Sequence, residues 1–231
     1  SDTSDYVWTT QTSAADNSWR SVCWASALTL FVAVSADGTD RVMTSPDGVT
    51  WTAHSVASTL WASVCWSPEL ALLVAVGDSS GAAGAMTSTD GTTWTARTTP
   101  TGGDYRSVCW SPDLTLFVAV GDAGLVMTSP DGVNWTAQTA ADANDWQAVC
   151  WSPDLNLFCA TAQTGIGNRI MTSPDGVNWV TQVSPSDIQW SGVCWSPELL
   201  IFCAVADGKS ATSADGITWV LHDIPDISGH G

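Results

Sequence analysis

The sequence predicts an all-β fold, a five-bladed β-propeller with four antiparallel strands in each blade. Two repeated patterns and their spacing lead to this prediction. The triplet Val-Cys-Trp occurs five times, and the pattern Thr-Ser-x-Asp-Gly-x-x-Trp also occurs five times. The two patterns alternate with a period of about 43 residues, which is the length of a propeller blade. The triplet tryptophans are Trp24, Trp66, Trp110, Trp151 and Trp195.

Each repeat holds four short β-like runs separated by turn residues. In the third copy the runs are 105–111, 115–121, 125–129 and 134–139, and they are rich in Val, Thr, Phe and Trp. These residues favour strands. Pro112 follows the first run, where a turn needs φ near −65°. After the third run, Asp131 can accept hydrogen bonds from its own turn, Gly132 can adopt a positive φ, and Trp135 can cover the hairpin.

The repeats define one domain over residues 1–231. The expected blades are 19–55, 61–98, 105–139, 146–183 and 190–223. No stretch shows a sustained helical period.

Two segments compete for one outer position in the fifth blade. Residues 6–12 resemble an additional fourth strand, and the C-terminal repeat supplies its own at 219–222. Either the N-terminal strand completes the fifth blade, or the local 209–222 hairpin does and the N-terminal strand lies outside or pairs with another molecule. The short loop favours the local hairpin, because it closes at low entropic cost.

Charge restricts the classes of partner. The chain has 23 acidic and 6 basic residues, for a net charge of −17. Such a surface repels phosphate backbones and anionic lipids, so we expect no nucleic-acid binding. No apolar run reaches the roughly 18–20 residues needed to cross a bilayer, so we expect no membrane insertion. The acidic, lysine-poor surface suits an extracellular location or a virion surface.

Most of the 15 tryptophans follow the repeat, in the triplet, in the Asp-Gly turn and just before the first strand. We expect the first two groups to fill the space between blades. The odd number of cysteines, seven, leaves at least one unpaired. Because five of them repeat in one position, we expect buried free thiols rather than disulfides, zinc or redox chemistry.

The two faces of the expected disc differ. Turns between the first and second and between the third and fourth strands lie on one face, where the copies are nearly identical. Loops between the second and third strands and between blades lie on the other, where the copies diverge, as at 77–85 and 162–169. Variable loops on a rigid scaffold are where binding usually occurs. We therefore expect any site on this variable face.

An aromatic residue precedes the first strand of every blade on the variable face, with polar neighbours around it. Such a surface can stack a sugar ring and hydrogen-bond its hydroxyls, and five equivalent junctions would give avidity. The same rings could instead cap the core. The expected ligand-binding residues are Trp19, Trp61, Tyr105, Trp146, Trp190, Asn17, Arg20, Asp104, Arg106, Asn144, Asp145, Gln147, Asp187 and Gln189.

No metal ligands, cofactor or catalytic residues are expected. Carboxylates at the ends of second strands, Asp78, Asp122 and Asp207, with Asp37 nearby, could gather a calcium ion. Such residues more often bind turn amides.

The Thr-Ser-x-Asp-Gly-x-x-Trp pattern resembles the Asp-box (BNR-like) repeat, whose families place it between the third and fourth strands of a blade. The resemblance covers most of the chain but implies a fold rather than an activity. The arrangement also looks similar to five-bladed lectin propellers of the tachylectin type, although it lacks their blade motif. That resemblance implies a multivalent, lectin-like carbohydrate binder, with glycans as partners.

Two other classes remain open. A structural or assembly component of a virion or microbial surface would use the disc and the additional strand for contacts, as a monomer or a strand-exchanged oligomer. Asp boxes also occur in sialidases and other glycoside hydrolases, so the resemblance leaves an enzyme as a further alternative. A catalytic site should break the repeat with a singular cluster of residues, and the sequence does not reveal one. We therefore expect no enzyme.

Overall fold

A computed structural model describes residues 9–79 and 83–224. It contains twenty strands and one 3-10 turn, η1 (Asp122–Gly124). We divide the strands into units I to V, with four in each. Unit I holds β1 (Trp19–Ala25), β2 (Leu30–Ser35), β3 (Val42–Ser45) and β4 (Thr52–His54); unit II holds β5 (Leu60–Ser67), β6 (Leu72–Ser79), β7 (Ala85–Ser88) and β8 (Thr95–Arg97); unit III holds β9 (Gly103–Ser111), β10 (Leu116–Gly121), β11 (Leu125–Ser129) and β12 (Thr136–Thr139); unit IV holds β13 (Trp146–Ser152), β14 (Leu157–Ala162), β15 (Ile170–Ser173) and β16 (Val180–Gln182); unit V holds β17 (Trp190–Ser196), β18 (Ile201–Ala206), β19 (Lys209–Ser213) and β20 (Val220–Asp223).

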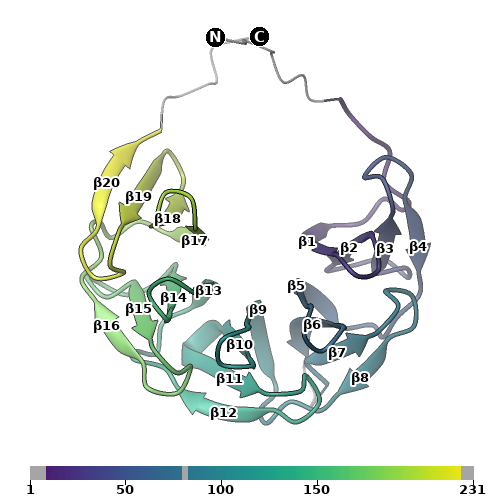
Figure 1. The fold of residues 1–231 in the computed structure, drawn as a ribbon, viewed down its shortest axis with the longest axis horizontal. Coiled ribbons are helices and arrows are strands. Elements are labelled where there is room, and N and C mark those ends of the chain that lie inside the picture. The colour runs from purple at the N-terminus through teal and green to yellow at the C-terminus, as the bar shows by residue number, and fades with distance from the viewer. Residues whose placement is uncertain (1–8, 80–82, 225–231) are drawn as a thin grey trace.

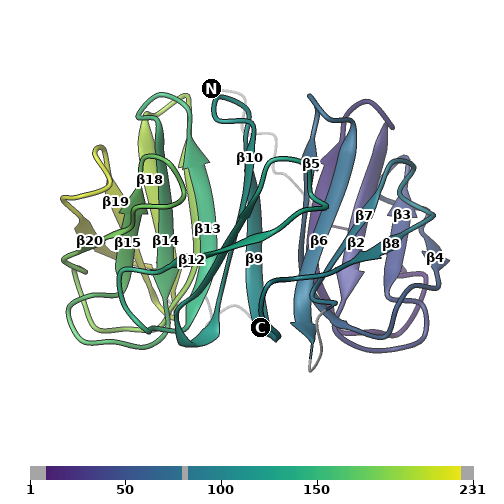
Figure 2. The ribbon, with the colours of Figure 1, turned by 90° about the horizontal axis from the view of Figure 1, so that it is seen from below.

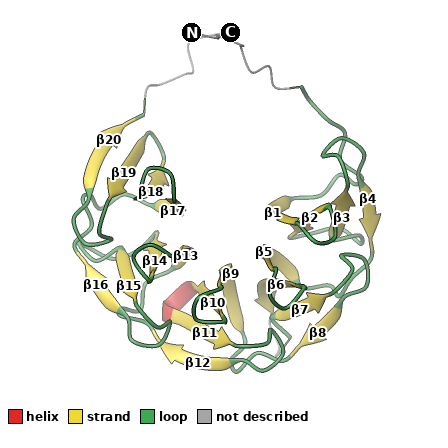
Figure 3. Ribbon diagram, in the orientation of Figure 1, coloured by secondary structure: helices red, strands yellow, loops and turns green. Residues whose placement is uncertain are grey.

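Within each unit the strands pair antiparallel in chain order. Units I, IV and V are separate four-stranded sheets. Units II and III are joined into one sheet by a short pairing of β6 with β9, at Asp78 with Asp104 and at Ser79 with Gly103. Figure 3 shows strands throughout, with η1 as the single helical segment of the described residues. The predicted all-β fold of repeated four-stranded antiparallel sheets is therefore confirmed.

The units follow one another around an arc (Figure 1). The first strand of each unit lies at the centre and the fourth strand at the outside. Seen from the side, the strands run roughly across the thickness of the molecule (Figure 2). The ribbon leaves an opening in the arc between units V and I, so the molecule is propeller-like.

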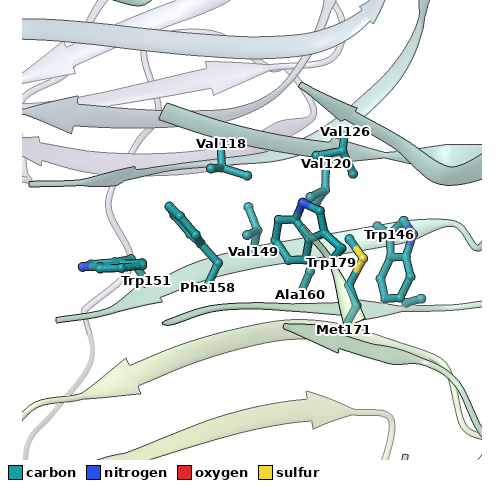
Figure 4. Close-up of a cluster of buried hydrophobic side chains, with 11 residues drawn as sticks. Val118, Val120, Val126, Trp146, Val149, Trp151, Phe158, Ala160, Met171 and Trp179 are labelled. Atoms are coloured by element: carbon teal, nitrogen blue, oxygen red, sulfur yellow. The ribbon is translucent and has the colours of Figure 1, made fainter. Parts of the chain in front are cut away.

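The core lies between successive units. Figure 4 shows the junction of units III and IV, where Val118, Val120 and Val126 face Val149 and Trp179. All five side chains are buried. Because valines from one sheet fill the space between aromatic and aliphatic residues of the next, the junctions provide the main apolar burial of the fold.

The turn between the third and fourth strands closes each unit with local hydrogen bonds; we call it the clasp. In unit III, Asp131 Oδ1 accepts from the backbone N–H groups of Val133 (2.8 Å) and Asn134 (2.7 Å). Gly132 has φ +70°, and the Trp135 Nε1 donates to its carbonyl at 3.0 Å. All three features match the prediction from the sequence. The same Asp and Trp bonds recur in the other four units.

The clasp bonds act on the carboxylate itself. Burial raises the pKa of the Asp131 carboxyl, but hydrogen bonds from Asn134, Val133 and Ser129 outweigh it and lower the pKa to about 2. The pKa of the clasp carboxyl is also lowered in each of the other units. Each clasp therefore favours the charged form of its aspartate.

All seven thiols are free. Burial raises the pKa of Cys65, Cys109, Cys150 and Cys159 well above the ordinary value, which suppresses the reactive thiolate. Cys194 differs, because it is exposed where unit V has no following unit. The expectation of buried thiols therefore does not hold at this position.

The additional N-terminal strand expected at 6–12 falls partly outside the described residues, 1–8 being excluded. Residues 9–12 belong to no strand. Strand β20 (Val220–Asp223) pairs with β19 at the outer edge of unit V. Among the described residues, no helix is long and apolar enough to cross a membrane.

Candidate functional site

The first strand of every unit contains a β-bulge near its start. The pairing register shifts between the leading aromatic residue and the residue two positions later, as between Trp19 and Ser21. A bulge leaves one residue unpaired and redirects its side chain. The bulged residues are Arg20, Ala62, Arg106, Gln147 and Ser191.

All five bulged residues line one cavity of about 360 Å³. Because they belong to the innermost strand of every unit, this cavity lies at the centre of the arc (Figure 1). The bulges sit where the inter-unit loops join the first strands, so the cavity opens on the variable face. Ala36, Leu60, Trp61 and Asp78 complete its lining. We call it the central cavity and take it as the candidate site.

An ion-pair cluster at the wall of the central cavity, built on the cavity-lining Arg106, breaks the repeat. Arg106 Nε lies 3.0 Å from Asp122 Oδ1, and Arg106 Nη2 lies 2.5 Å from Asp122 Oδ2. The same Nη2 also donates to Asp104 Oδ2 at 3.1 Å. Gln147, from the next unit, donates to Asp122 Oδ1 at 3.2 Å. Two carboxylates and an amide therefore hold the guanidinium of Arg106 in a fixed orientation.

A second carboxylate contact involves Asp78 and Asp104, the pair that joins β6 to β9. A hydrogen bond between their side chains, together with partial desolvation and the charge of Asp78, raises the pKa of Asp104. Neighbouring carboxylates favour sharing a proton, because two adjacent negative charges repel. In contrast, hydrogen bonding to Asp122 raises the pKa of Arg106 and keeps it charged.

The cluster thus offers both kinds of hydrogen-bonding group within one small volume. Arg106, Gln147 and Arg20 supply donors to the cavity and Asp78 supplies an acceptor, while Asp104 and Asp122 lie behind Arg106 as its ion-pair partners. No described carboxylate forms an ion pair with Arg20. No cluster of metal-ligating side chains occurs within 9–79 and 83–224. The chemistry available is recognition of a small polar molecule with several hydroxyl, amide or amine groups.

The leading aromatic residues are mostly buried. Trp61, Trp146 and Trp190 are 0% exposed and Tyr105 is 1% exposed, whereas Trp19 is half-buried. Each indole donates to a backbone carbonyl four residues earlier, as from Trp61 to Ala57 at 3.1 Å. Four of the rings therefore have no free face for a sugar, and their burial favours the core-capping alternative.

Several expected polar site residues brace loops instead. Asn17 donates to the Asp40 carbonyl at 2.7 Å, and Asn144 donates to the Asn168 carbonyl at 2.8 Å. Asp145 accepts from the Ala123 N–H, and Asp187 accepts from the Gly167 N–H. These groups are occupied by the protein, so the structure does not gather them into a site.

One expected residue has neither role. Gln189 is exposed, in the linker that precedes β17, and it does not line the central cavity.

The cavity and its ion-pair cluster bring together Arg20, Asp104, Arg106 and Gln147 from the sequence prediction. The ligand-binding prediction did not include Asp78 and Asp122, which were considered for calcium only. Their position at the ends of β6 and just after β10 was the available signal. The bulge that turns Arg106 toward them has no signature in the sequence.

No protein-family model matches the chain, and no curated protein matches it. Among solved structures, a virginiamycin B lyase from Staphylococcus aureus has a TM-score of 0.78 at 10% identity, covering 92% of this chain and 72% of the lyase chain. YCF48 bound to D1 peptide has a TM-score of 0.65 at 16% identity, covering 90% and 69%. A nidogen/laminin complex has a TM-score of 0.63 at 8% identity, covering 85% and 75%.

These likenesses concern the fold. At identities of 16% or lower, they assign no activity. The similar structures include a lyase as well as proteins bound to a peptide or to another protein. We conclude that the chain has a propeller-like fold and that its function has to be argued from the central cavity.

Proposed function

We propose that this protein is a non-enzymatic, lectin-like binding module that holds a carbohydrate in the central cavity. One observation carries the proposal: all five bulged residues converge on this cavity, and one of them, Arg106, is held there by ion pairs with Asp104 and Asp122. A saccharide presents hydroxyl groups that both donate and accept, and the cluster offers both partners at short range.

The cluster is pre-organised for binding. Arg106 is held by two carboxylates and Asp122 by a second donor from Gln147, so little side-chain entropy is lost when a ligand is bound. The mixed signs also suit a neutral ligand. Arg106 and its two carboxylates already pair with one another, and a sugar can share these partners without leaving any of the three charges unpaired.

The proposal places one site at the centre instead of five equivalent sites at the junctions. The buried aromatic rings and the loop-bracing roles of Asn17 and Asn144 support this change. The ion pairs of Arg106 with Asp104 and Asp122 support binding rather than catalysis. Both carboxylates hold the guanidinium in place, so neither is free to act as an acid, a base or a nucleophile. The structures of similar fold include a lyase as well as proteins bound to a peptide or to another protein, so they support neither class over the other.

We further propose that the five units are propeller blades and that the clasps are Asp boxes. The recurrence of the Asp-to-amide and Trp-to-Gly hydrogen bonds in all five units supports this assignment. An extracellular or virion-surface location remains our proposal, supported by the net charge of −17. A role in surface assembly is the second candidate, favoured by the exposed apolar sides of units I and V.

A glycan array followed by titration calorimetry tests the binding proposal. The wild-type chain should bind one class of glycan, and Arg106→Ala should weaken that binding at least tenfold, because it removes the fixed donor. The matched control is Arg97→Ala, in the outer strand β8, which should bind like wild type. Absence of any glycan hit, or equal loss in both variants, would contradict the proposal.

A further inference from the structure

Every unit has two different sides. The front side carries the triplet Val and Trp, such as Val149 and Trp151. The rear side carries Val118 and Val120, or the equivalent residues of another unit. At each internal junction the rear side of one unit covers the front side of the next, as Figure 4 shows for units III and IV. The arc has four such junctions, I/II to IV/V.

No unit of the described residues covers the front side of unit I. Val22 is 59% exposed, whereas the equivalent Val64, Val108 and Val149 are 5–6% exposed. A hollow of about 320 Å³ lies on this side, lined by Trp19, Val22, Ala33, Met43 and Trp51 together with Arg20 and Ser21. In unit IV the equivalents of the five apolar residues are Trp146, Val149, Ala160, Met171 and Trp179, which receive the valines of unit III. The hollow on unit I therefore has the same apolar lining as the front side of unit IV at the III/IV junction.

The rear side of unit V likewise faces no other unit within 9–79 and 83–224. Val205 is 41% exposed, whereas Val34, Val76 and Val120 at the same position are 0% exposed. Cys194, which lies beside it on β17, is also exposed. Unit V therefore presents the apolar residues that fill the hollow in an internal junction.

A hydrogen bond between neighbouring units adds a specific polar contact to the apolar packing of the junctions. The triplet tryptophan donates from Nε1 to a carboxylate in the first turn of the preceding unit: Trp110 to Glu69 (2.6 Å), Trp151 to Asp113 (2.9 Å) and Trp195 to Asp154 (3.0 Å). Unit I has Ala27 at the carboxylate position, and the buried Trp66 Nε1 has no partner.

A donor and an acceptor of the kind that form this hydrogen bond lie at the two ends of the arc. Trp24, on unit I, is 43% exposed and has no preceding carboxylate. Glu198 lies in the first turn of unit V, and within the described residues no later unit places a tryptophan beside it. Placing unit I after unit V would bring donor and acceptor together, as at three of the four internal junctions.

We infer that the front side of unit I binds the rear side of unit V of a second copy of this chain, head to tail, with Trp24 of one copy donating to Glu198 of the other. The second copy supplies both complementary surfaces, because its sides repeat those of the internal junctions. Such a contact is heterologous and forms a ring if the rotation closes and an open chain if it does not.

The arc itself sets a condition on this assembly. The opening between units V and I is smaller than the arc (Figure 1), so a second copy does not fit there in the same plane. Either two arcs widen into one ring, or the second copy is displaced along the axis. Because each copy carries a charge of −17, association should strengthen with salt.

Sedimentation velocity in 0.15 M and 0.5 M salt tests the inference. Wild type should show a mass of at least two chains, and the fraction associated should rise with salt. Val22→Glu blocks the front side of unit I, and Val205→Glu blocks the rear side of unit V, so each variant alone should be monomeric. An equimolar mixture should form a dimer of one chain of each variant, because each retains the surface that the other lacks.

Ile166→Glu is the matched control, since Ile166 is 87% exposed in the loop between β14 and β15 and belongs to neither side. It should associate like wild type. Near-UV circular dichroism should show native tertiary structure for all three variants. A monomeric wild type at both salt concentrations, or a mixture that remains monomeric, would overturn the inference. Dimerisation of either single variant would also overturn it.

Discussion

The clasp face and the variable face of this molecule use the same kind of residue in opposite ways. On the clasp face, Asp131 accepts hydrogen bonds from its own turn, within three residues in the sequence. On the variable face, Asp122 binds Arg106 and Gln147, which are 16 and 25 residues away. The first arrangement repeats in every unit, whereas the second occurs once. The aspartates that bind their own turn hold the fold, whereas Asp122, bound to Arg106 and Gln147, belongs to the candidate site.

The difference also appears in the pKa values. The pKa of the clasp carboxyls is lowered, because the folded state donates hydrogen bonds to their charged form. The pKa of Asp104 on the variable face is raised, because Asp78 lies against it. The clasp face therefore contributes mainly to stability, and the variable face carries the candidate binding site.

The largest effect should come from acid. A group whose folded pKa is lowered stabilises the protein above its unfolded pKa of about 4 and loses that contribution as the pH falls through the folded pKa. For Asp131 and Asp175 the folded pKa is about 2. The raised pKa of Asp104 changes the stability in the opposite direction, but it is one carboxyl group against the five clasp carboxyls. Urea unfolding should give similar midpoints at pH 7 and 5, where the clasp carboxylates are charged in both states, and falling midpoints at pH 3 and 2.5. A profile that stays flat down to pH 2.5 would contradict the role of the clasps.

Removal of one clasp carboxylate should give the next largest effect. Asp131→Ala leaves the amides of Val133 and Asn134 and the side chains of Asn134 and Ser129 without their acceptor. We expect a loss of about 2 kcal/mol in the free energy of unfolding. Asp16→Ala, at an exposed position with no hydrogen bond in the structure, is the control and should change little. Equal effects in both would remove the distinction.

A gain of about 1 kcal/mol should follow from Ala27→Glu on the clasp face. The new carboxylate takes the position of Glu69, Asp113 and Asp154 and can accept from the buried Trp66 Nε1, which has no partner. Chemical denaturation measures the gain. The double variant Ala27→Glu with Trp66→Phe checks the cause, because the glutamate should then give no benefit.

The smallest effect on stability should come from Arg106→Ala in the central cavity. Its ion pairs are partly exposed, with 36% of the Arg106 side chain accessible, and such pairs contribute less than about 1 kcal/mol. The unfolding midpoint should therefore hardly move, while glycan binding is lost. A loss as large as that of Asp131→Ala would show that the cluster is structural and would weaken the division between the faces.

Much of the fold could be predicted from the sequence. The strands of the third copy, expected at 105–111, 115–121, 125–129 and 134–139, agree with β9 to β12 to within about two residues. The clasp bonds of Asp131 and Trp135 could also be predicted. These features depend on contacts within a few residues, so a repeated sequence pattern records them directly.

The candidate site was only partly predictable. Arg20, Arg106 and Gln147 were expected from their place beside the leading aromatic residues, but so were Asn144 and Asp187, which brace loops. The sequence does not distinguish these two groups, because the distinction depends on which side chain a bulge turns toward the centre.

The sequence by itself determined the repeated four-stranded unit, its turns and the placement of variable loops on one face, because these follow from local hydrogen bonding and strand alternation. Only the tertiary structure decided that Asp78 meets Asp104 and that the bulged residues share one cavity. It also decided that Val22 and Val205 lie exposed at the two ends of an open arc. These outcomes depend on how each unit packs against the next, and nearly identical repeats leave that geometry to the junctions.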